Sequence, residues 1–424
     1  MSTVLAYTSP AAGHAFPLVP GLLELQRRGH TVHLRTDPDL VRTIRAAGLH
    51  VQSVDPRIPA MKVADHASRS ARERLQRGLN DLLARGDLER ADLDRAVADV
   101  DPDVILVDCN AYGAAVAAQA SDRPWATTLP TLLPLPGRGI PPYGLGLRPR
   151  SGPLGAARDR LLWRGVVRAY GGAMLPRLNA LRAGAGLDPL ASPIEHVLAP
   201  DRVLVLTGEP LEYPRRDAPP SVRFCGAQSW DPPAEPPAWL LEDGDPWVLV
   251  TCSTEYQSDE RLAATAIEAL RDEPVRVAVT MADAYGAPLP RAANARVERF
   301  VPHAPLLARA AAVVCPGGMG VTQKAIAAGV PVVAVPFGRD QPEVARRVVE
   351  CGAGVRLTTK RLSPERLRAA VRRAIALRPS AQRAGERLRE AGGSAALATA
   401  VEGIAPPQRS RAASSTRERT SSLA

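Results

Sequence analysis

Three closely spaced glycines carry the clearest chemical signal in this sequence. Gly317, Gly318 and Gly320 follow a short apolar run and precede a helical pattern, so we expect them at a turn from a strand into a helix. Glycines at such a turn let backbone N–H groups approach an anion, and the helix N-terminus adds positive potential. The segment lacks the lysine of a GxxxxGKS/T phosphate loop and the GxGxxG spacing of a dinucleotide site. It therefore predicts a cradle for a diphosphate.

Alternating strand and helix patterns must position this turn. Short apolar runs bounded by turn residues alternate with helical patterns through both halves of the chain, which is typical of parallel α/β layers. The predicted strands are 4–8, 31–34, 51–54, 104–107 and 125–129 in the first half, and 247–251, 275–280, 297–300, 312–315 and 330–336 in the second. We therefore predict an α/β protein with two doubly wound, Rossmann-like domains facing each other across a cleft, with ligands at the carboxyl ends of the strands.

Proline-rich segments suggest where the chain divides. We predict an N-terminal domain over 1–209, an interdomain linker over 210–246, which holds three Pro-Pro pairs, and a C-terminal domain over 247–379. A helical segment over 380–404 could return to the N-terminal domain. The tail over 405–424 is too polar to bury a core and is predicted to be disordered. The Pro-, Gly- and Leu-rich stretch 131–155 is predicted to be a long irregular excursion.

Composition narrows the class of protein. The 424 residues include 54 basic and 44 acidic side chains, for a net charge of +10, but only Lys62, Lys324 and Lys360 are lysines and the arginines are scattered. No aromatic–basic interleaving accompanies them, so we expect no nucleic-acid partner. The five cysteines are odd in number and form no CxxC motif, which favours a reducing cytoplasm over a disulfide framework or a zinc site. No apolar run is long enough to span a membrane, and we expect no membrane insertion.

The segment 315–352, CPGGMGVTQKAIAAGVPVVAVPFGRDQPEVARRVVECG, resembles the nucleotide-sugar signature of family 1 glycosyltransferases, the UDP-glycosyltransferase superfamily with the GT-B fold. The similarity extends over about residues 3–402. It includes the Gly13-His14 loop, GHTV at 29–32, Asp108 after a strand, the FVPH segment at 300–303 and Asp340-Gln341. Within the superfamily the chain is most similar to actinobacterial natural-product and macrolide-type enzymes.

The resemblance implies catalytic roles for two residues of the first half. His14 matches the position of the general base, and Asp108 matches the carboxylate that orients and charges that histidine. A neutral imidazole, with a pKa of about 6.5, suits the removal of a proton from an alcohol or phenol as it attacks an anomeric carbon. Such help is typically worth ~10²–10⁴-fold in rate. His14 could instead cap a helix or face solvent, and Asp108 could cap the helix predicted over 110–120.

The resemblance also implies a donor site in the second half. Phe300 matches an aromatic that stacks on the nucleobase, Val301 a backbone contact to the base edge, Ser253-Thr254 a phosphate contact and Asp340-Gln341 the pair that holds the sugar hydroxyls. Phe300 could equally be a core aromatic, and His303 a helix-start residue. The predicted donor-binding residues are Ser253, Thr254, Phe300, Val301, His303, Gly317, Gly318, Gly320, Val321, Asp340 and Gln341.

Two positions depart from the family pattern. Pro316 replaces a histidine that contacts the diphosphate, and proline offers no backbone N–H either. Lys324 replaces a glutamate that binds the ribose hydroxyls, and a lysine cannot accept those hydrogen bonds. The second change favours a deoxyribose nucleotide, whereas Asp340-Gln341 fits ordinary hexose donors, so the choice between UDP and dTDP stays open.

These observations predict an inverting, metal-independent glycosyltransferase of secondary metabolism, without a cofactor, that moves a hexose or deoxyhexose from an NDP-sugar to a hydroxylated apolar small molecule. The apolar acceptor is inferred from the stretch 131–155, which we expect to wall its pocket. Two alternatives are an NDP-sugar epimerase of the same fold and a glycosyltransferase-like helper or binding subunit. The sequence does not fix the oligomeric state.

Overall fold

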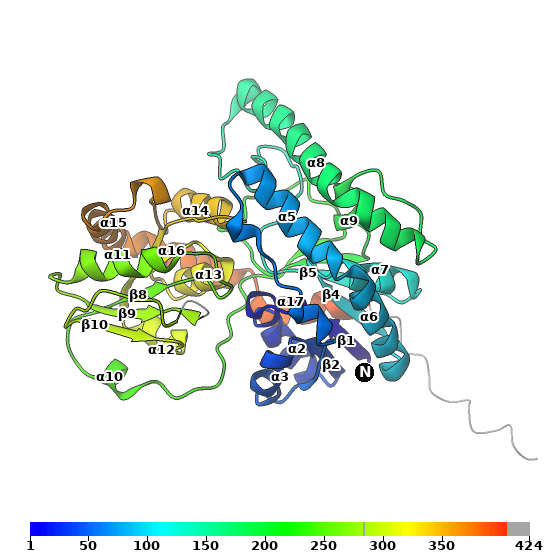
Figure 1. Cartoon of the computed structure of the whole chain (residues 1–424), viewed down its shortest axis with the longest axis horizontal. Coiled ribbons are helices and arrows are strands. Elements are labelled where there is room, and N and C mark those ends of the chain that lie inside the picture. Colours follow the sequence, from blue (N-terminus) through cyan, green and yellow to red (C-terminus); the bar gives the residue numbers. More distant parts are fainter. Residues whose placement is uncertain (283–284, 405–424) are drawn as a thin grey trace, which may run out of the picture.

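The computed structural model describes residues 1–282 and 285–404, so the tail predicted to be disordered lies outside the described residues (Figure 1). Two all-parallel sheets lie in separate lobes, which confirms the predicted doubly wound α/β class. The first sheet has the strand order β3-β2-β1-β4-β5-β6-β7. Its strands are β1 (Thr3–Tyr7), β2 (Thr31–Thr36), β3 (His50–Ser53), β4 (Val104–Asp108), β5 (Trp125–Leu129), β6 (Arg202–Val205) and β7 (Val222–Phe224).

The second sheet has the order β10-β9-β8-β11-β12-β13. Its strands are β8 (Trp247–Thr251), β9 (Arg276–Thr280), β10 (Ala295–Glu298), β11 (Ala310–Cys315), β12 (Val332–Ala334) and β13 (Gly354–Arg356). In both sheets the strand order reverses at the centre, between β1 and β4 and between β8 and β11. Ligands of open α/β sheets bind beside the carboxyl ends of strands at such a reversal, so each sheet offers one natural site.

Helices cover both faces of each sheet. The first lobe contains α1 (Ala12–Ala15), α2 (Val19–Arg27), α3 (Pro38–Arg45), α4 (Arg57–Ala60), a 3₁₀ turn η1 (Asp65–Ala67), α5 (Ala71–Ala84), α6 (Gly86–Val100), α7 (Tyr112–Ala120), α8 (Gly152–Ala183) and α9 (Pro193–Val197). The second contains α10 (Ala238–Leu241), α11 (Glu260–Leu270), α12 (His303–Ala308), α13 (Met319–Ala327), α14 (Gln341–Glu350), η3 (Thr359–Arg361), α15 (Pro364–Ala376) and α16 (Arg378–Glu390). None of the helices described here is both long and apolar enough to cross a bilayer.

The boundaries between the lobes are less simple than the sequence suggests. The predicted linker 210–246 contributes β7, which pairs with β6 at the edge of the first sheet, and also α10. An edge strand three residues long tolerates neighbouring prolines, which hid it in the sequence. At the other end, α16 packs on α13, whereas α17 (Gly393–Glu402) packs on α2 in the first lobe. Leu397, Ala398 and Val401 are buried in the core of that lobe.

The contact between α6 and α7 depends on two glycines and is a sensitive point of the first lobe. A Cβ atom added at Gly113 would lie 1.9 Å from the carbonyl oxygen of Gly86, and backbone cannot move aside cheaply. We expect Gly113→Ala to destabilise the protein by about 3 kcal/mol through overpacking, measured as a lower thermal unfolding midpoint. Gly165→Ala on α8 is the matched control, since that Cβ would meet nothing within 4 Å. Equal midpoints for the two variants would contradict the packing argument.

Candidate active site

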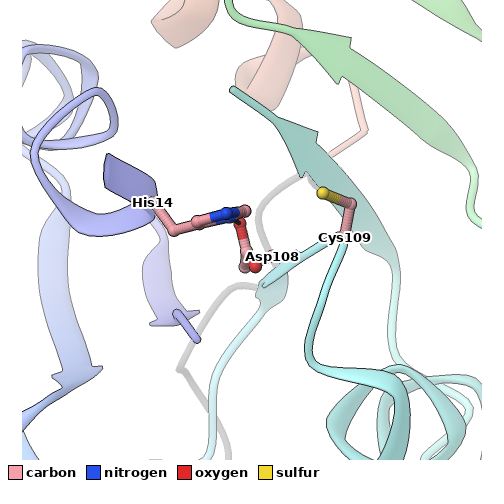
Figure 2. Close-up of side chains that lie close together, drawn as sticks. All are labelled: His14, Asp108 and Cys109. Atoms are coloured by element: carbon pink, nitrogen blue, oxygen red, sulfur yellow. Dashed lines mark hydrogen bonds and ion pairs between the residues drawn. The ribbon is translucent and has the colours of Figure 1, made fainter. Parts of the chain in front are cut away.

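His14 and Asp108 form a hydrogen-bonded pair at the carboxyl edge of the first sheet (Figure 2). Asp108 is the last residue of β4, and His14 lies in α1, a short helix after β1 within a segment that we predicted to be a loop. His14 Nδ1 lies 2.8 Å from Asp108 Oδ2. The Asp108 side chain is fully buried, whereas 23% of the His14 side chain remains exposed. The pair thus occupies the reversal point between β1 and β4 with one ring edge accessible.

Electrostatics make this imidazole more basic than an ordinary histidine. Burial lowers the pKa of His14, but the charge of Asp108 and the hydrogen bond to it raise the pKa more, and the net pKa is well above the usual value. Asp108 also accepts a hydrogen bond from the backbone N–H of Asn110 at 3.0 Å through Oδ1. Asp108 therefore contacts both His14 and the turn that follows β4, whereas the N-cap of α7 is Ala111, without a side-chain cap hydrogen bond.

Cys109 completes a group of three possible ligand atoms. Donor atoms of His14, Asp108 and Cys109 lie within 4.8 Å of one another, the one such grouping in the part of the chain that the structure describes. Both carboxylate oxygens of Asp108 are already hydrogen-bonded. Burial raises the pKa of the Cys109 thiol to about 11, so this thiol is protonated near neutral pH.

The glycine turn lies at the reversal point of the second sheet, between β11 and α13. Gly317 adopts a φ of +93°, which favours glycine, and an added Cβ there would lie 3.2 Å from the backbone oxygen of Gln341. Gly318 is the N-cap of α13, and added Cβ atoms at Gly318 and Gly320 would meet nothing within 4 Å. The space in front of the helix N-terminus is therefore lined by backbone, as a diphosphate cradle requires.

A chain of contacts joins this turn to the loops around it and to the first lobe. Ser253, in the loop after β8, receives a hydrogen bond of 3.4 Å from the side-chain amide of Gln341, at the N-terminus of α14. A Cβ atom added at Gly13, beside His14, would lie 3.8 Å from the hydroxyl of Thr254. The histidine loop of one lobe and the predicted phosphate loop of the other therefore lie close to each other.

The residues predicted to bind the nucleobase differ in how far their side chains are exposed. Phe300 is 46% exposed, so it is not a core aromatic and its ring is open to stacking. Val301 is buried in the core of the second lobe, which leaves only its backbone for a ligand. His303 begins α12, where burial and then the charge of Lys324 lower its pKa to about 4. Val321 lies in the first turn of α13, partly buried against the same core.

Lys324 lies beside His303 and forms an ion pair with Asp231, a residue that the sequence analysis did not identify. Its ammonium group donates to Asp231 Oδ1 at 2.6 Å and to the backbone oxygen of Trp230. Asp231 Oδ2 accepts from the backbone N–H of Ala304 at 2.8 Å. The segment 210–246 therefore reaches the predicted nucleoside end of the donor site, and its carboxylate neutralises the unusual lysine.

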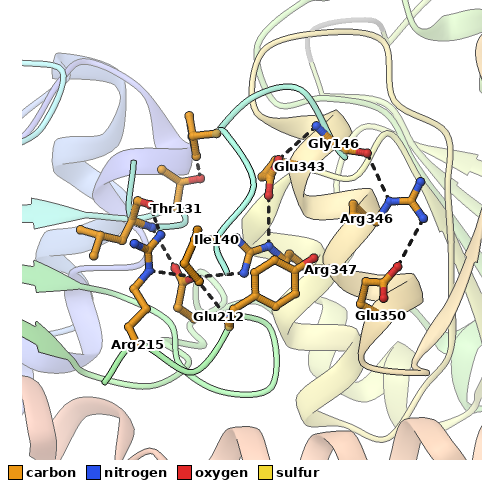
Figure 3. Close-up of polar contacts among 12 residues, drawn as sticks. Thr131, Ile140, Gly146, Glu212, Arg215, Glu343, Arg346, Arg347 and Glu350 are labelled. Carbon is orange, nitrogen blue, oxygen red and sulfur yellow. Dashed lines mark hydrogen bonds and ion pairs between the residues drawn. The ribbon is translucent and has the colours of Figure 1, made fainter. Parts of the chain in front are cut away.

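Polar contacts also link the two lobes around α14 (Figure 3). The hydroxyl of Thr131 donates to Asp340 Oδ2 at 2.7 Å, so a predicted sugar-binding carboxylate is reached from the first lobe. The backbone N–H of Gly146 donates to Glu343 Oε2 at 3.1 Å. The irregular stretch before α8 thus bridges the lobes. Leu132, Leu133 and Leu135 of this stretch are buried, with Leu132 in the core of the second lobe, whereas Leu145 and Leu154 are exposed.

The basicity of His14 leads to a pH prediction for Asp108→Asn. Because a base must be neutral to work, and Asp108 raises the pKa of His14, wild-type kcat/KM should rise with pH up to well above pH 6.5. Removing that charge lowers the pKa of His14, so the acid limb should move to lower pH while the plateau falls by about 10²-fold or more. Asp94→Asn, an exposed position, is the control. If the acid limb did not move, the pH profile would not report the ionisation of His14, and the prediction would be wrong.

The chain is similar to known proteins in sequence and in fold. Residues 272–404 match the family described as Erythromycin biosynthesis protein CIII-like, C-terminal domain. The chain is 34% identical over 387 residues to 4′-demethylrebeccamycin synthase of Lentzea aerocolonigenes, a match that covers 87% of this chain and 90% of that protein. The solved structure of the glycotransferase of kitacinnamycin has a TM-score of 0.72 and 23% identity, covering 96% and 99% of the two chains.

A spinosyn rhamnosyltransferase has been solved both complexed with thymidine diphosphate and complexed with spinosyn aglycone. The first of these has a TM-score of 0.70 and 19% identity, covering 94% of this chain and 100% of that one. At such identity the solved structures establish a shared fold, GT-B.

Proposed function

This chain belongs to the glycosyltransferases of actinobacterial natural-product pathways, and from that premise we propose that it transfers a hexose or deoxyhexose from a nucleoside diphosphate to a hydroxylated apolar small molecule with inversion. The observation that carries this proposal is the proximity of the His14 loop to the Ser253–Thr254 loop, which joins the edge of the first sheet at its reversal point to that of the second. A direct displacement at the anomeric carbon needs a base on the side of the acceptor and a diphosphate cradle on the side of the leaving group, and here the two lie on opposite lobes.

The proposed reaction is a single displacement. The acceptor hydroxyl gives its proton to His14 Nε2 as its oxygen forms a bond to the anomeric carbon, and the bond from that carbon to the diphosphate oxygen breaks. Asp108, hydrogen-bonded to Nδ1, stabilises the imidazolium that forms. Attack from the face opposite the leaving group inverts the anomeric centre. The diphosphate leaves with both bonding electrons.

We propose that the leaving diphosphate is stabilised by the protein without a metal. Backbone N–H groups around Gly318 and the N-terminus of α13 face the space in which it would lie, and such preorganised donors stabilise developing negative charge. Pro316 contributes neither a backbone donor nor a side-chain donor, so the residues that follow it must supply the hydrogen bonds to the diphosphate. Phosphate contact from the Ser253–Thr254 loop is part of the same proposal.

A thymidine nucleotide is the donor that we favour. Lys324, held by Asp231, cannot accept a hydrogen bond from a ribose hydroxyl, which removes one reason to prefer ribose over deoxyribose. The spinosyn rhamnosyltransferase of the same fold was solved with thymidine diphosphate. Calorimetry should show thymidine diphosphate binding more tightly than UDP, and both more tightly than ADP. Equal affinity for all three would contradict a pyrimidine site beside Phe300.

An apolar natural-product aglycone is the acceptor that we propose, because the names of two relatives refer to rebeccamycin and to a spinosyn aglycone. The decisive experiment is a donor-by-acceptor screen of the purified protein, read by mass spectrometry. We expect a glycosylated product that requires both substrates, with inverted anomeric configuration. Epimerised donor without acceptor would favour the epimerase alternative, and tight donor binding without turnover would favour the helper subunit. A cytoplasmic location stays a prediction.

A further inference from the structure

The free ring nitrogen of His14 already has a partner. While Nδ1 faces Asp108, Nε2 lies 3.2 Å from the side-chain amide nitrogen of Asn110, two residues beyond the carboxylate. The same residue donates its backbone N–H to Asp108 Oδ1 at 3.0 Å. Asn110 therefore contacts both members of the pair, through its backbone on one side and its side chain on the other.

The proton positions follow from the carboxylate. An ionised carboxylate only accepts hydrogen bonds, so Nδ1 carries a proton, and in the neutral ring the Nε2 lone pair faces Asn110. A lone pair is matched by the NH₂ end of an amide, which is the end that the structure places there, while Asn110 Oδ1 accepts from the Cys109 thiol at 3.9 Å. In this orientation of the amide the hydrogen bond forms with the neutral ring alone, because an imidazolium would present an N–H to the same NH₂ group.

The other titratable groups around the ring favour its charged form. Asp108 and Cys109 act on the imidazole directly, and their ionised forms favour the imidazolium. Behind them, Asp340 of α14 acts on Cys109, and Glu89 of α6 interacts with Asp108. Burial and the Asn110 amide oppose these groups. Among the contacts of the ring in the described residues, the Asn110 amide is thus the polar contact that favours the neutral base.

We propose that Asn110 is a positioning residue that selects the Nδ1–H tautomer of the neutral His14 ring and that the incoming acceptor hydroxyl replaces its amide at Nε2. The replacement of the amide by the acceptor hydroxyl rests on the proposed function, since the hydroxyl must donate to the same Nε2 lone pair. The exchange of one donor for another keeps Nε2 hydrogen-bonded before and during the reaction. It also means that an acceptor unable to displace the amide is not deprotonated.

The test measures the pKa of His14 and the activity separately. Ring-nitrogen chemical shifts of His14, assigned with a His14→Ala variant, are followed by NMR through the pH range in which histidine titrates. In Asn110→Ala the pKa of His14 should rise by roughly half a unit to one unit, because one neutral hydrogen bond to the neutral form is lost. In Asn110→Asp, which keeps the size of the side chain, it should rise further, because a carboxylate favours the imidazolium.

The acid limb of kcat/KM should move upward by the same amounts in these variants, opposite to the shift expected for Asp108→Asn. Asn80→Ala, on the exposed side of α5, is the matched control and should move neither readout. A folded Asn110→Ala protein whose His14 pKa is unchanged or lower would overturn the inference. If the NMR pKa shifts but His14→Ala retains its full rate, the base proposal fails and the tautomer control by Asn110 stands.

Discussion

Replacing His14 with alanine should reduce the rate of glycosyl transfer by about 10²–10⁴-fold, because the acceptor would lose its general base. The His14 side chain belongs to the first lobe, whereas the glycine turn lies in the second. Binding of the nucleoside diphosphate should therefore change little. Steady-state rates with saturating donor and acceptor, together with calorimetric titration of the nucleotide, separate the two effects.

His50→Ala is the matched control for this variant, since His50 lies on the exposed edge strand β3. It should retain the wild-type rate. Should His14→Ala also retain that rate in a folded protein, His14 would not be the base, and the displacement proposed here would need another proton acceptor.

The second large effect is expected from Arg347→Met in α14. The Arg347 guanidinium donates to Glu212 Oε1 at 3.0 Å and to Glu343 Oε1 at 3.2 Å, and all three side chains are at most 2% exposed (Figure 3). Its Cζ lies 3.3 Å from the centre of the Tyr213 ring. Removing the cation leaves the buried Glu343 without its ion-pair partner and Glu212 with Arg215 alone, which should cost about 3–5 kcal/mol. Thermal and denaturant unfolding measure the loss.

Arg373→Met provides the control, because Arg373 is exposed on α15. The loss in Arg347→Met should shrink at acidic pH. Burial raises the pKa of Glu343, and a carboxyl that is protonated no longer needs the cation. A difference between the two variants below about 1 kcal/mol, which is the range of an exposed ion pair, would contradict the buried network.

The sequence predicted most of the features that lie at the ends of strands. Asp108 ends an apolar run and the glycines follow another, and parallel strands bring such ends to one edge, so the reversal points could be anticipated. The role of His14 needed a family resemblance, because a histidine in a loop has no distinctive pattern of its own. The short helix α1 around it was missed, since four residues are too few to show helical periodicity.

Contacts between distant residues could not be predicted in this way. Thr131 reaches Asp340 across 209 residues, and Asp231 reaches Lys324 across 93, and neither pair shares a local pattern. The exposure of Phe300 depends on which segments pack over the loop before α12, and the alternation of apolar residues in the sequence does not show this. Asn110 is a different case, since it stands two residues from a predicted catalytic carboxylate, and a search of the neighbours of Asp108 would have found it.

A crystal structure of the protein with thymidine diphosphate and an accepted aglycone would test the central claim most directly. The account predicts diphosphate oxygens within hydrogen-bonding distance of the backbone N–H groups at the start of α13. It also predicts the acceptor hydroxyl at His14 Nε2, with the Asn110 amide displaced. A diphosphate bound away from the glycine turn, or a hydroxyl out of reach of His14, would contradict it.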